Sequence, residues 1–427
     1  MLNTLFSLVA LFVTTFLMLV GNGLLGSLLG LRLAQQGAGP LAAAVVMTGY
    51  YAGLVAGALL CTRIIRRVGH IRAFAAFCAT NIATTLLLSI IGGAPVWTLL
   101  RFCTGLSMMG AYMVIESWLN ERAEASMRGR VFSIYMLVSY GGIGLSQFLL
   151  GFSERAGQTL LVIAALLFAL CMLPVVLTRA AVPGPMEKVV FDIRHLFRLA
   201  PHALYGCLAA GFITGAFYAL GPVFAFTRDG NSNLVGVFMG LTILGGLVLQ
   251  WPLGLLSDRF KRRTILLVLG IALAAASLLL LATSTTRYGE WLMAVVWGGL
   301  AFTIYPVAVA YANDRIAPKD LVPAAGALLM AYSAGAALGP LLASVAMRAS
   351  GARGLYLFTA VVGLLLALLV ARRRGAERVP VAEQGSYLPV PRTSTVINQL
   401  DPRGEEASES DSEQLDRAKD ENQGQIP

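Results

Sequence analysis

Residues 101–144 read RFCTGLSMMGAYMVIESWLNERAEASMRGRVFSIYMLVSYGGIG. The stretch begins as an apolar run that carries Arg101 and Glu116, is interrupted by the charged segment NERAEASMRGR, and continues as a second apolar run rich in glycine. Residues of the same type recur 193 positions later, within the same alternation of apolar and charged sequence. The recurring pairs are Gly105 and Gly298, Tyr112 and Tyr305, Asn120 and Asn313, and Gly142 and Gly335. A single offset for all four pairs predicts a duplicated unit of about 190 residues.

The composition is that of a membrane protein. Of 427 residues, 57% are hydrophobic and only 13% are charged, whereas soluble chains have roughly 45–50% apolar and about 25% charged residues. A membrane span needs about 20 apolar residues. Runs of this kind predict an all-α integral membrane protein with twelve spans, at 5–31, 40–62, 73–93, 95–119, 131–152, 158–178, 201–226, 234–256, 264–283, 289–312, 322–347 and 354–371.

The basic residues are distributed unequally between the loops. Loops after the even-numbered spans, up to the tenth, hold 17 Lys and Arg residues, and loops after the odd-numbered spans hold 6. Positively charged loops stay on the cytoplasmic side of a membrane, so we expect both termini in the cytoplasm. The formal net charge of +10 then reflects orientation in the bilayer, and no nucleic-acid partner is expected.

The duplication divides the chain into four parts. Residues 1–178 and 201–371 are expected to form two pseudo-symmetric six-helix halves, joined by a cytoplasmic central loop at 179–200. Residues 372–427 follow the last span, and from residue 375 onward they hold 5 basic and 11 acidic residues. Such a segment buries too little apolar surface to fold alone, so a disordered, acidic cytoplasmic tail is expected. Any contact of this tail with the basic loops should centre on its acidic run at 405–413.

The segment from Gly254 to Arg263 reads GLLSDRFKRR. It resembles the Gly-x-x-x-Asp-Arg signature loop of the major facilitator superfamily, which lies between spans 2 and 3 and often again between spans 8 and 9. In the first copy here, Arg66 stands where the aspartate would be. The further segments ESWLNERA, RGR, YM and SYGG resemble the YcaD-like branch of that superfamily. The resemblance covers residues 1–372 and implies a fold of two six-helix halves.

The resemblance also implies a cytoplasmic latch between the halves. Asp258 is expected to accept hydrogen bonds at a facing helix N-terminus, with Arg128 and Arg130 as candidate partners. The other candidate gate residues are basic residues of the same set of loops: Arg66, Arg67, Arg122, Arg259, Arg262 and Arg263. The alternative is that these tight basic loops only set the orientation in the membrane.

Two charged residues fall inside the fourth span. Arg101 opens an Arg-x-x-x-Gly sequence that resembles a motif of proton-coupled members of the superfamily, and charges inside a membrane are costly and usually functional. The alternative is that Arg101 extends to the membrane interface. Glu116 is a candidate proton carrier, or else a gate residue that pairs with a basic side chain such as Arg122.

Uncharged polar side chains inside the spans are candidates for a substrate pocket. By resemblance, spans 1, 4, 7 and 10 line the cavity, and spans 2, 5, 8 and 11 flank it. The candidates are Asn22, Tyr112, Gln147, Tyr218, Gln250 and Tyr305. Taken alone, each such residue is more often part of a hydrogen bond between neighbouring helices. Close helix packing likewise explains Gly335-x-x-x-Gly339-Pro340, which resembles an antiporter motif that the family places in span 5.

These observations favour a secondary transporter of the inner membrane. We expect a monomer that moves a small neutral or amphipathic molecule by alternating access, with protons as a second substrate if Glu116 carries one. No Walker A sequence is present, which argues against ATP as the energy source. The alternative is a non-transporting sensor or a membrane-embedded enzyme on the same scaffold. However, the sequence contains no catalytic grouping and no metal-ligand spacing, so no enzyme, metal or cofactor is expected.

Overall fold

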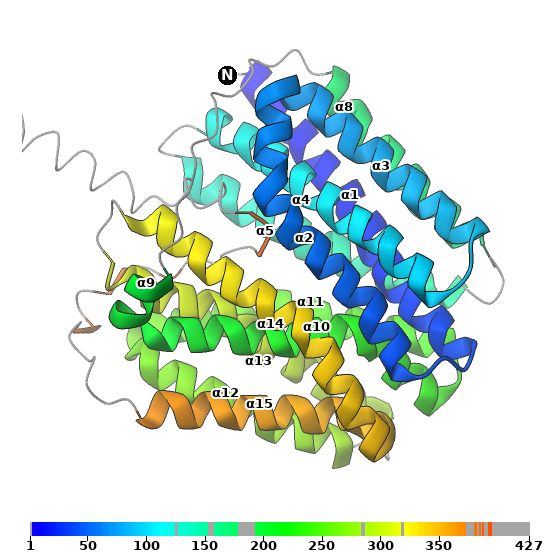
Figure 1. Cartoon of the computed structure of the whole chain (residues 1–427). Coiled ribbons are helices and arrows are strands. Elements are labelled where there is room, and N and C mark those ends of the chain that lie inside the picture. The colour runs from blue at the N-terminus through cyan, green and yellow to red at the C-terminus, as the bar shows by residue number, and fades with distance from the viewer. Residues whose placement is uncertain are drawn as a thin grey trace, which may run out of the picture.

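Long apolar helices make up almost all of the computed structural model. The structure describes residues 2–123, 127–152, 158–177, 193–282, 287–316 and 320–372, and eight tail residues, namely Pro380, Val381, Gln384, Gly385, Tyr387, Arg392, Thr393 and Ser394. Within these ranges there are helices and no strands. Figure 1 shows the helices up to α8, coloured from blue through cyan to bluish green, in one bundle, and the helices from α10 on, coloured green to orange, in a second.

The first bundle runs from the N-terminus to residue 177. Its helices are α1 (Leu2–Gln35), α2 (Pro40–Val68), α3 (His70–Ile90), α4 (Ala94–Arg122), α5 (Arg128–Gln147), the 3-10 helix η2 (Phe148–Phe152), α7 (Thr159–Leu170) and α8 (Met172–Leu177). Proline in the first turn opens α2 and α4, where its missing N–H is no loss because that group has no partner inside the helix.

The second bundle follows the short helix α9 (Ile193–Leu199). Its helices are α10 (Pro201–Asp229), α11 (Ser232–Arg259), α12 (Arg262–Ala282), α13 (Arg287–Asn313), α14 (Leu321–Ser350), the 3-10 helix η5 (Gly351–Arg353) and α15 (Gly354–Arg372). Gly230 ends α10 in a left-handed conformation, and the Asn231 side chain caps α11 by accepting from the backbone N–H of Asn233 at 2.8 Å. Both are common helix-end devices.

The helices are long enough to cross a membrane many times. Eleven stretches of the described chain have the length and hydropathy of a span. The last of them, Pro323–Arg372, is 50 residues long and contains both α14 and α15. One crossing needs about 20 residues of helix, so this stretch is long enough for two. The multi-pass membrane protein that the composition predicts is therefore confirmed, and the number of twelve crossings stays a prediction.

Equivalent pairs of helices pack together in the two bundles. Helix α2 packs on α4 as α11 packs on α13, α1 packs on α5 as α10 packs on α14, and α3 packs on α7 as α12 packs on α15. The glycine pair of the sequence repeat lies at two of these crossings. A Cβ atom on Gly105 would be 2.0 Å from the carbonyl oxygen of Tyr50, and one on Gly298 would be 1.9 Å from that of Thr242. These glycines recur because the same close approach of two backbones occurs twice.

Substituting either glycine by alanine is expected to destabilise the protein strongly. Gly105→Ala and Gly298→Ala should each lower the free energy of unfolding by about 1–3 kcal/mol or more, because a methyl group cannot fit against a backbone carbonyl without moving a helix. The measurement is the thermal unfolding midpoint in detergent. Gly141→Ala is the matched control, because a Cβ atom there would meet nothing within 4 Å. Equal midpoints for all three variants would contradict the repeated crossing.

The two bundles contact each other through α1 and α10, α2 and α14, and α5 and α11. Gln35, at the end of α1, donates from Nε2 to the hydroxyl of Ser232 at 3.2 Å. In the first half of α2, the Thr48 hydroxyl donates to the carbonyl oxygen of Ala337 at 2.9 Å. We call this side of the molecule the Gln35 end, and the opposite side, where α11 ends beside Asp258, the Asp258 end. The bundles are thus joined by hydrogen bonds toward the Gln35 end.

The described tail residues differ from the solvated segment that the sequence predicts. Tyr387 and Ser394 are buried, with 8% and 1% of their surface exposed. Both lie against the helical bundles, as shown below. The reason is that the tail is not uniform: residues 380–394 hold one acidic and one basic residue, and most of the acidic residues follow residue 400. The acidic run at 405–413 lies outside the described residues.

Candidate functional site

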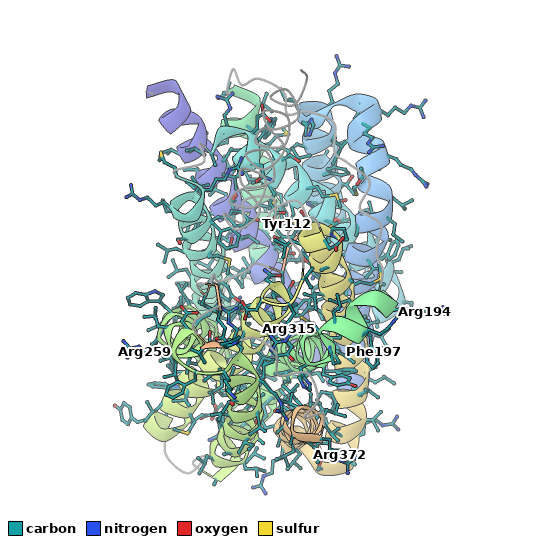
Figure 2. The ribbon with its side chains drawn as sticks, turned by 90° about the vertical axis from the view of Figure 1, so that its left-hand side faces the viewer. Tyr112, Arg194, Phe197, Arg259, Arg315 and Arg372 are labelled. Carbon is teal, nitrogen blue, oxygen red and sulfur yellow. The ribbon has the colours of Figure 1, made fainter. Side chains whose placement is uncertain are left out.

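A cavity of about 150 Å³ lies between the two bundles. That volume is well above the roughly 10–15 Å³ that one water molecule needs. Its walls come from both bundles, and Figure 2 labels one lining residue, Tyr112, in the first of them. Tyrosines dominate the lining: Tyr50, Tyr51, Tyr112, Tyr140, Tyr218 and Tyr332. Two arginines also line it, Arg101 from α4 and Arg392 from the tail. The cavity wall formed by the helices is therefore aromatic and rich in hydroxyl groups, with one arginine, Arg101.

Arg101 is buried in the wall of this cavity and does not extend to the membrane interface. Its side chain is 1% exposed. Its guanidinium carbon lies 4.2 Å from the ring centroid of Tyr50, and Nη2 contacts the sulfur of Met47 at 3.8 Å. Among the described residues, Nε and Nη1 have no hydrogen-bond partner. Burying an uncompensated charge is unfavourable, so this arrangement suits a group that arrives from outside the protein.

Three of the six predicted pocket residues line the cavity, namely Asn22, Tyr112 and Tyr218. Asn22 donates from Nδ2 to the hydroxyl of Tyr50 at 3.0 Å, so it also orients the ring on which Arg101 lies. The ring stack and the amide together fix the position of the Arg101 guanidinium.

The other three predicted residues do not line the cavity. Gln147 donates to the carbonyl oxygens of Ile143 at 3.0 Å and Gly23 at 3.3 Å, and so joins α5 to α1. Gln250 is buried in α11. Tyr305 is buried with its ring centroid 5.1 Å from that of Tyr332. The prediction missed the tyrosines of spans 2, 5 and 11, and the adjacent Tyr50 and Tyr51 inside an apolar run were the available signal.

Glu116 lies on α4 and is fully buried. The hydroxyl of Tyr135 donates to its Oε1 atom at 2.8 Å. Two tail residues complete the site, because the hydroxyls of Thr393 and Ser394 donate to Oε1 and Oε2. Hydroxyl groups can donate to a carboxylate and can also accept from a carboxylic acid. The surroundings of Glu116 therefore suit both of its protonation states.

The signature loop forms a charged cluster at the Asp258 end. Arg262 is 1% exposed, and its guanidinium lies 3.2 Å from the carboxylate of Asp314 and 3.4 Å from that of Asp258. Asp258 also accepts from the backbone N–H of Tyr387 in the tail at 2.8 Å. Among the described contacts of Asp258, the donors are Arg262 and the backbone of Tyr387, and the predicted partners Arg128 and Arg130 are not among them.

The other predicted gate residues are more peripheral. Arg263 donates to the carbonyl oxygens of Val370 and Ala371 at the end of α15. Arg128 donates from Nε to the carbonyl oxygen of Ala123 at 3.5 Å. Arg122 is partly buried. The exposed side chains in this set are those of Arg66, Arg67, Arg130 and Arg259. In Figure 2, Arg259 and Arg315 both lie in the second bundle, Arg259 at its outer edge.

The two aspartates of the cluster are expected to differ in their effect on stability. Asp314→Asn should lower the free energy of unfolding by about 3–5 kcal/mol, because it leaves the buried Arg262 guanidinium with the partly exposed Asp258 carboxylate as its acidic partner in the cluster. Both side chains of that pair are 0% exposed. Asp258→Asn should cost clearly less, because the Asp258 side chain is 30% exposed. Thermal unfolding of both variants in detergent measures the difference, and equal losses would contradict this ranking.

Comparison with known proteins gives one consistent family. The Major Facilitator Superfamily model matches residues 11–311 and 230–402. The uncharacterized MFS-type transporter YcaD of Escherichia coli is 28% identical over 375 residues, which cover 86% of this chain and 95% of that protein. The uncharacterized MFS-type transporter Ent638_1421 of Enterobacter sp. (strain 638) is 27% identical over 368 residues, again covering 86% of this chain and 95% of that protein.

Solved transporter structures share the fold. The nucleoside transporter NupG superposes with a TM-score of 0.72 at 14% identity, covering 86% of this chain and 98% of that chain. A bacterial homolog of the human lysosomal transporter Spinster, in an inward-facing and occupied conformation, superposes with a TM-score of 0.68 at 14% identity, covering 89% and 98%. At this identity the likeness concerns the arrangement of the helices alone.

Proposed function

Because the chain belongs to the Major Facilitator Superfamily and is a transporter rather than an enzyme, we propose that it is a secondary transporter that moves a small amphipathic molecule across the bacterial inner membrane by alternating access. One observation carries the proposal. The cavity has walls from both bundles, and the hydrogen bonds of Gln35 and Thr48 join the two bundles toward the Gln35 end. A rocking motion of two halves around such a site is the mechanism of many transporters built from repeats.

The lining of the cavity supports an amphipathic substrate over a fully neutral one. Tyrosine rings offer flat apolar faces, and their hydroxyls offer hydrogen bonds. Arg101 adds a positive charge, and two of its donor atoms have no hydrogen-bond partner within the described part of the chain. Ligand pockets commonly combine aromatic walls with a few polar groups that fix the orientation of the ligand. A molecule with a planar apolar part and an anionic or strongly accepting group fits this combination.

The contacts between the bundles support an inward-facing state. The hydrogen bonds of Gln35 and Thr48 close the Gln35 end, and the tail approaches from the Asp258 end. The distribution of basic residues favours the cytoplasm for that end. In this proposal the protein has twelve spans with both termini in the cytoplasm, acts as a monomer, and releases or accepts its substrate on the cytoplasmic side.

The experiment that tests the proposal is transport into proteoliposomes. Compounds that raise the thermal unfolding midpoint of the purified protein are selected first, because a ligand that binds only the native state stabilises it. Each is then supplied in labelled form to proteoliposomes, with and without a pH gradient. We expect saturable uptake of at least one compound above that of protein-free liposomes. Stabilising ligands that bind but never cross the membrane would favour a sensor on this scaffold.

A further inference from the structure

The tail contacts the same cavity, and we propose that its described residues act as a built-in ligand. In this proposal Arg392 occupies a site for a guanidinium or another organic cation, and the tail holds the transporter in the present conformation until it is displaced. The consequence for transport rests on the proposed function. The binding itself does not, because it concerns only the contacts between the tail and the two bundles.

The site of Arg392 is formed by aromatic rings and one carbonyl oxygen of α13. The guanidinium carbon lies 5.0, 5.6 and 5.4 Å from the ring centroids of Phe302, Tyr305 and Tyr332. Cations are attracted to aromatic faces within about 6 Å, and aromatic cages are a recurrent way to bind organic cations. The Nη2 atom of Arg392 also donates to the carbonyl oxygen of Phe302 at 2.6 Å.

That carbonyl oxygen is available because of a proline. In an α-helix the carbonyl of residue 302 would accept from the N–H of residue 306, and residue 306 is Pro306, inside α13. Proline has no N–H, so the helix leaves this acceptor unsatisfied. An unsatisfied carbonyl surrounded by aromatic rings is a binding site for a cationic donor. The sequence of α13 thus builds the site, and Arg392 fills it.

The next two tail residues join the site to the other bundle. Thr393 and Ser394 donate their hydroxyls to Glu116 on α4, while Arg392 is bound to α13. Three consecutive residues therefore connect both halves from within the space between them. The halves cannot close over this space while the tail is there, so the bound tail favours the present conformation.

The charged cluster at the Asp258 end holds the preceding part of the tail. Tyr387 donates its backbone N–H to Asp258 at 2.8 Å. Gly385 donates to Asp314 at 3.3 Å and accepts from Arg262. The Tyr387 ring lies directly on Gly254, where a Cβ atom would be 2.1 Å from the ring. The Gly and Asp positions of the signature loop are thus both used to receive the tail.

A tethered ligand competes strongly with a free one. A ligand segment that belongs to the same chain as its site has an effective concentration on the order of millimolar. A soluble cation or peptide must therefore overcome the tail before it can bind. Weakening the attached tail at Arg392 should open the site to a ligand that is added in solution.

The test uses the full-length protein and a labelled peptide of residues 380–395, PVAEQGSYLPVPRTST. Fluorescence anisotropy measures binding of this peptide to the wild type and to Arg392→Ala. We expect the variant to bind the peptide at least about tenfold more tightly, because its own tail competes less well without Arg392. Arg353→Ala, which removes an exposed arginine elsewhere, should behave as the wild type. Size-exclusion profiles and unfolding midpoints confirm that each variant is folded.

Three results would overturn the proposal. These are equal affinities for the wild type and Arg392→Ala, absence of binding to both, and equal binding of a peptide that carries Arg392→Ala. The test also separates this inference from the proposed function. If the peptide binds as expected but no compound is transported, the cation site is supported and the transport proposal is contradicted. If a compound is transported but the peptide does not bind as expected, the transport proposal is supported and the role of the tail as a ligand is contradicted.

Discussion

Arg101→Ala is expected to lower the initial rate of transport by about 10- to 100-fold without destabilising the protein. Hydrogen bonds to a charged group contribute about 1.5–3 kcal/mol, which corresponds to this range of factors. The substrate would lose them, because Arg101 lines the cavity and two of its nitrogens have no partner among the described residues. Stability should be unchanged or higher, since the substitution removes a buried charge for which the described residues provide no acidic partner.

Two measurements check this prediction, the rate of uptake into proteoliposomes and the thermal unfolding midpoint. Arg101→Lys is the matched variant. It keeps the positive charge but loses the planar, forked set of donors, so we expect a rate between those of the wild type and Arg101→Ala. If Arg101→Ala transports at the wild-type rate, Arg101 does not bind the substrate and has a structural role. The same conclusion follows if Arg101→Ala unfolds before its transport can be measured.

Glu116→Gln is expected to abolish accumulation driven by a pH gradient while exchange of substrate continues. Glutamine has the size of glutamate and can hydrogen-bond to the same hydroxyls, but it cannot carry a proton. The site suits such a role because Glu116 is fully buried and accepts from the hydroxyls of Tyr135, Thr393 and Ser394. The measurement compares gradient-driven uptake with counterflow in the same proteoliposomes.

The outcomes for Glu116 separate the alternatives that the sequence leaves open. Survival of both activities would make Glu116 a structural residue. Loss of both would make it a gate residue or one that the fold requires. Tyr135→Phe is the control, because it removes one hydroxyl donor and leaves the carboxylate able to titrate. It should retain accumulation in the gradient.

The helices could be predicted because their signal is local. About 20 consecutive apolar residues give a membrane helix wherever they occur, and the repeated Gly105 and Gly298 mark the same crossing in both bundles. The site was predicted only in part. Whether a polar side chain faces the cavity or a neighbouring helix depends on the rotation of its helix, which composition does not encode. Gln147 faces α1 for that reason, whereas Asn22 lines the cavity.

The tail shows a second limit of composition. Averaged over its length it is acidic and polar, which predicts a dispensable segment whose removal after Arg374 leaves transport intact. The described tail residues are instead bound to the helices, because Tyr387 and Arg392 contact the second bundle and Ser394 contacts the first. Their sites become visible only in three dimensions, since Asp258, Phe302 and Glu116 come from three different helices. Asp258 accordingly receives the tail in place of the helix terminus that the sequence suggested.

The central claim is that the two bundles open alternately at opposite ends. The most direct test is double electron–electron resonance, which measures the distance between two spin labels attached to cysteines introduced into a cysteine-free variant. One pair at Gln36 and Asn231 reports the Gln35 end, and one at Arg130 and Arg259 reports the Asp258 end; all four side chains are exposed. Disruption of the tail by Arg392→Ala, with a stabilising ligand added, should lengthen distances in the first pair and shorten them in the second. Distances that stay fixed, or that change in the same direction at both ends, would contradict alternating access.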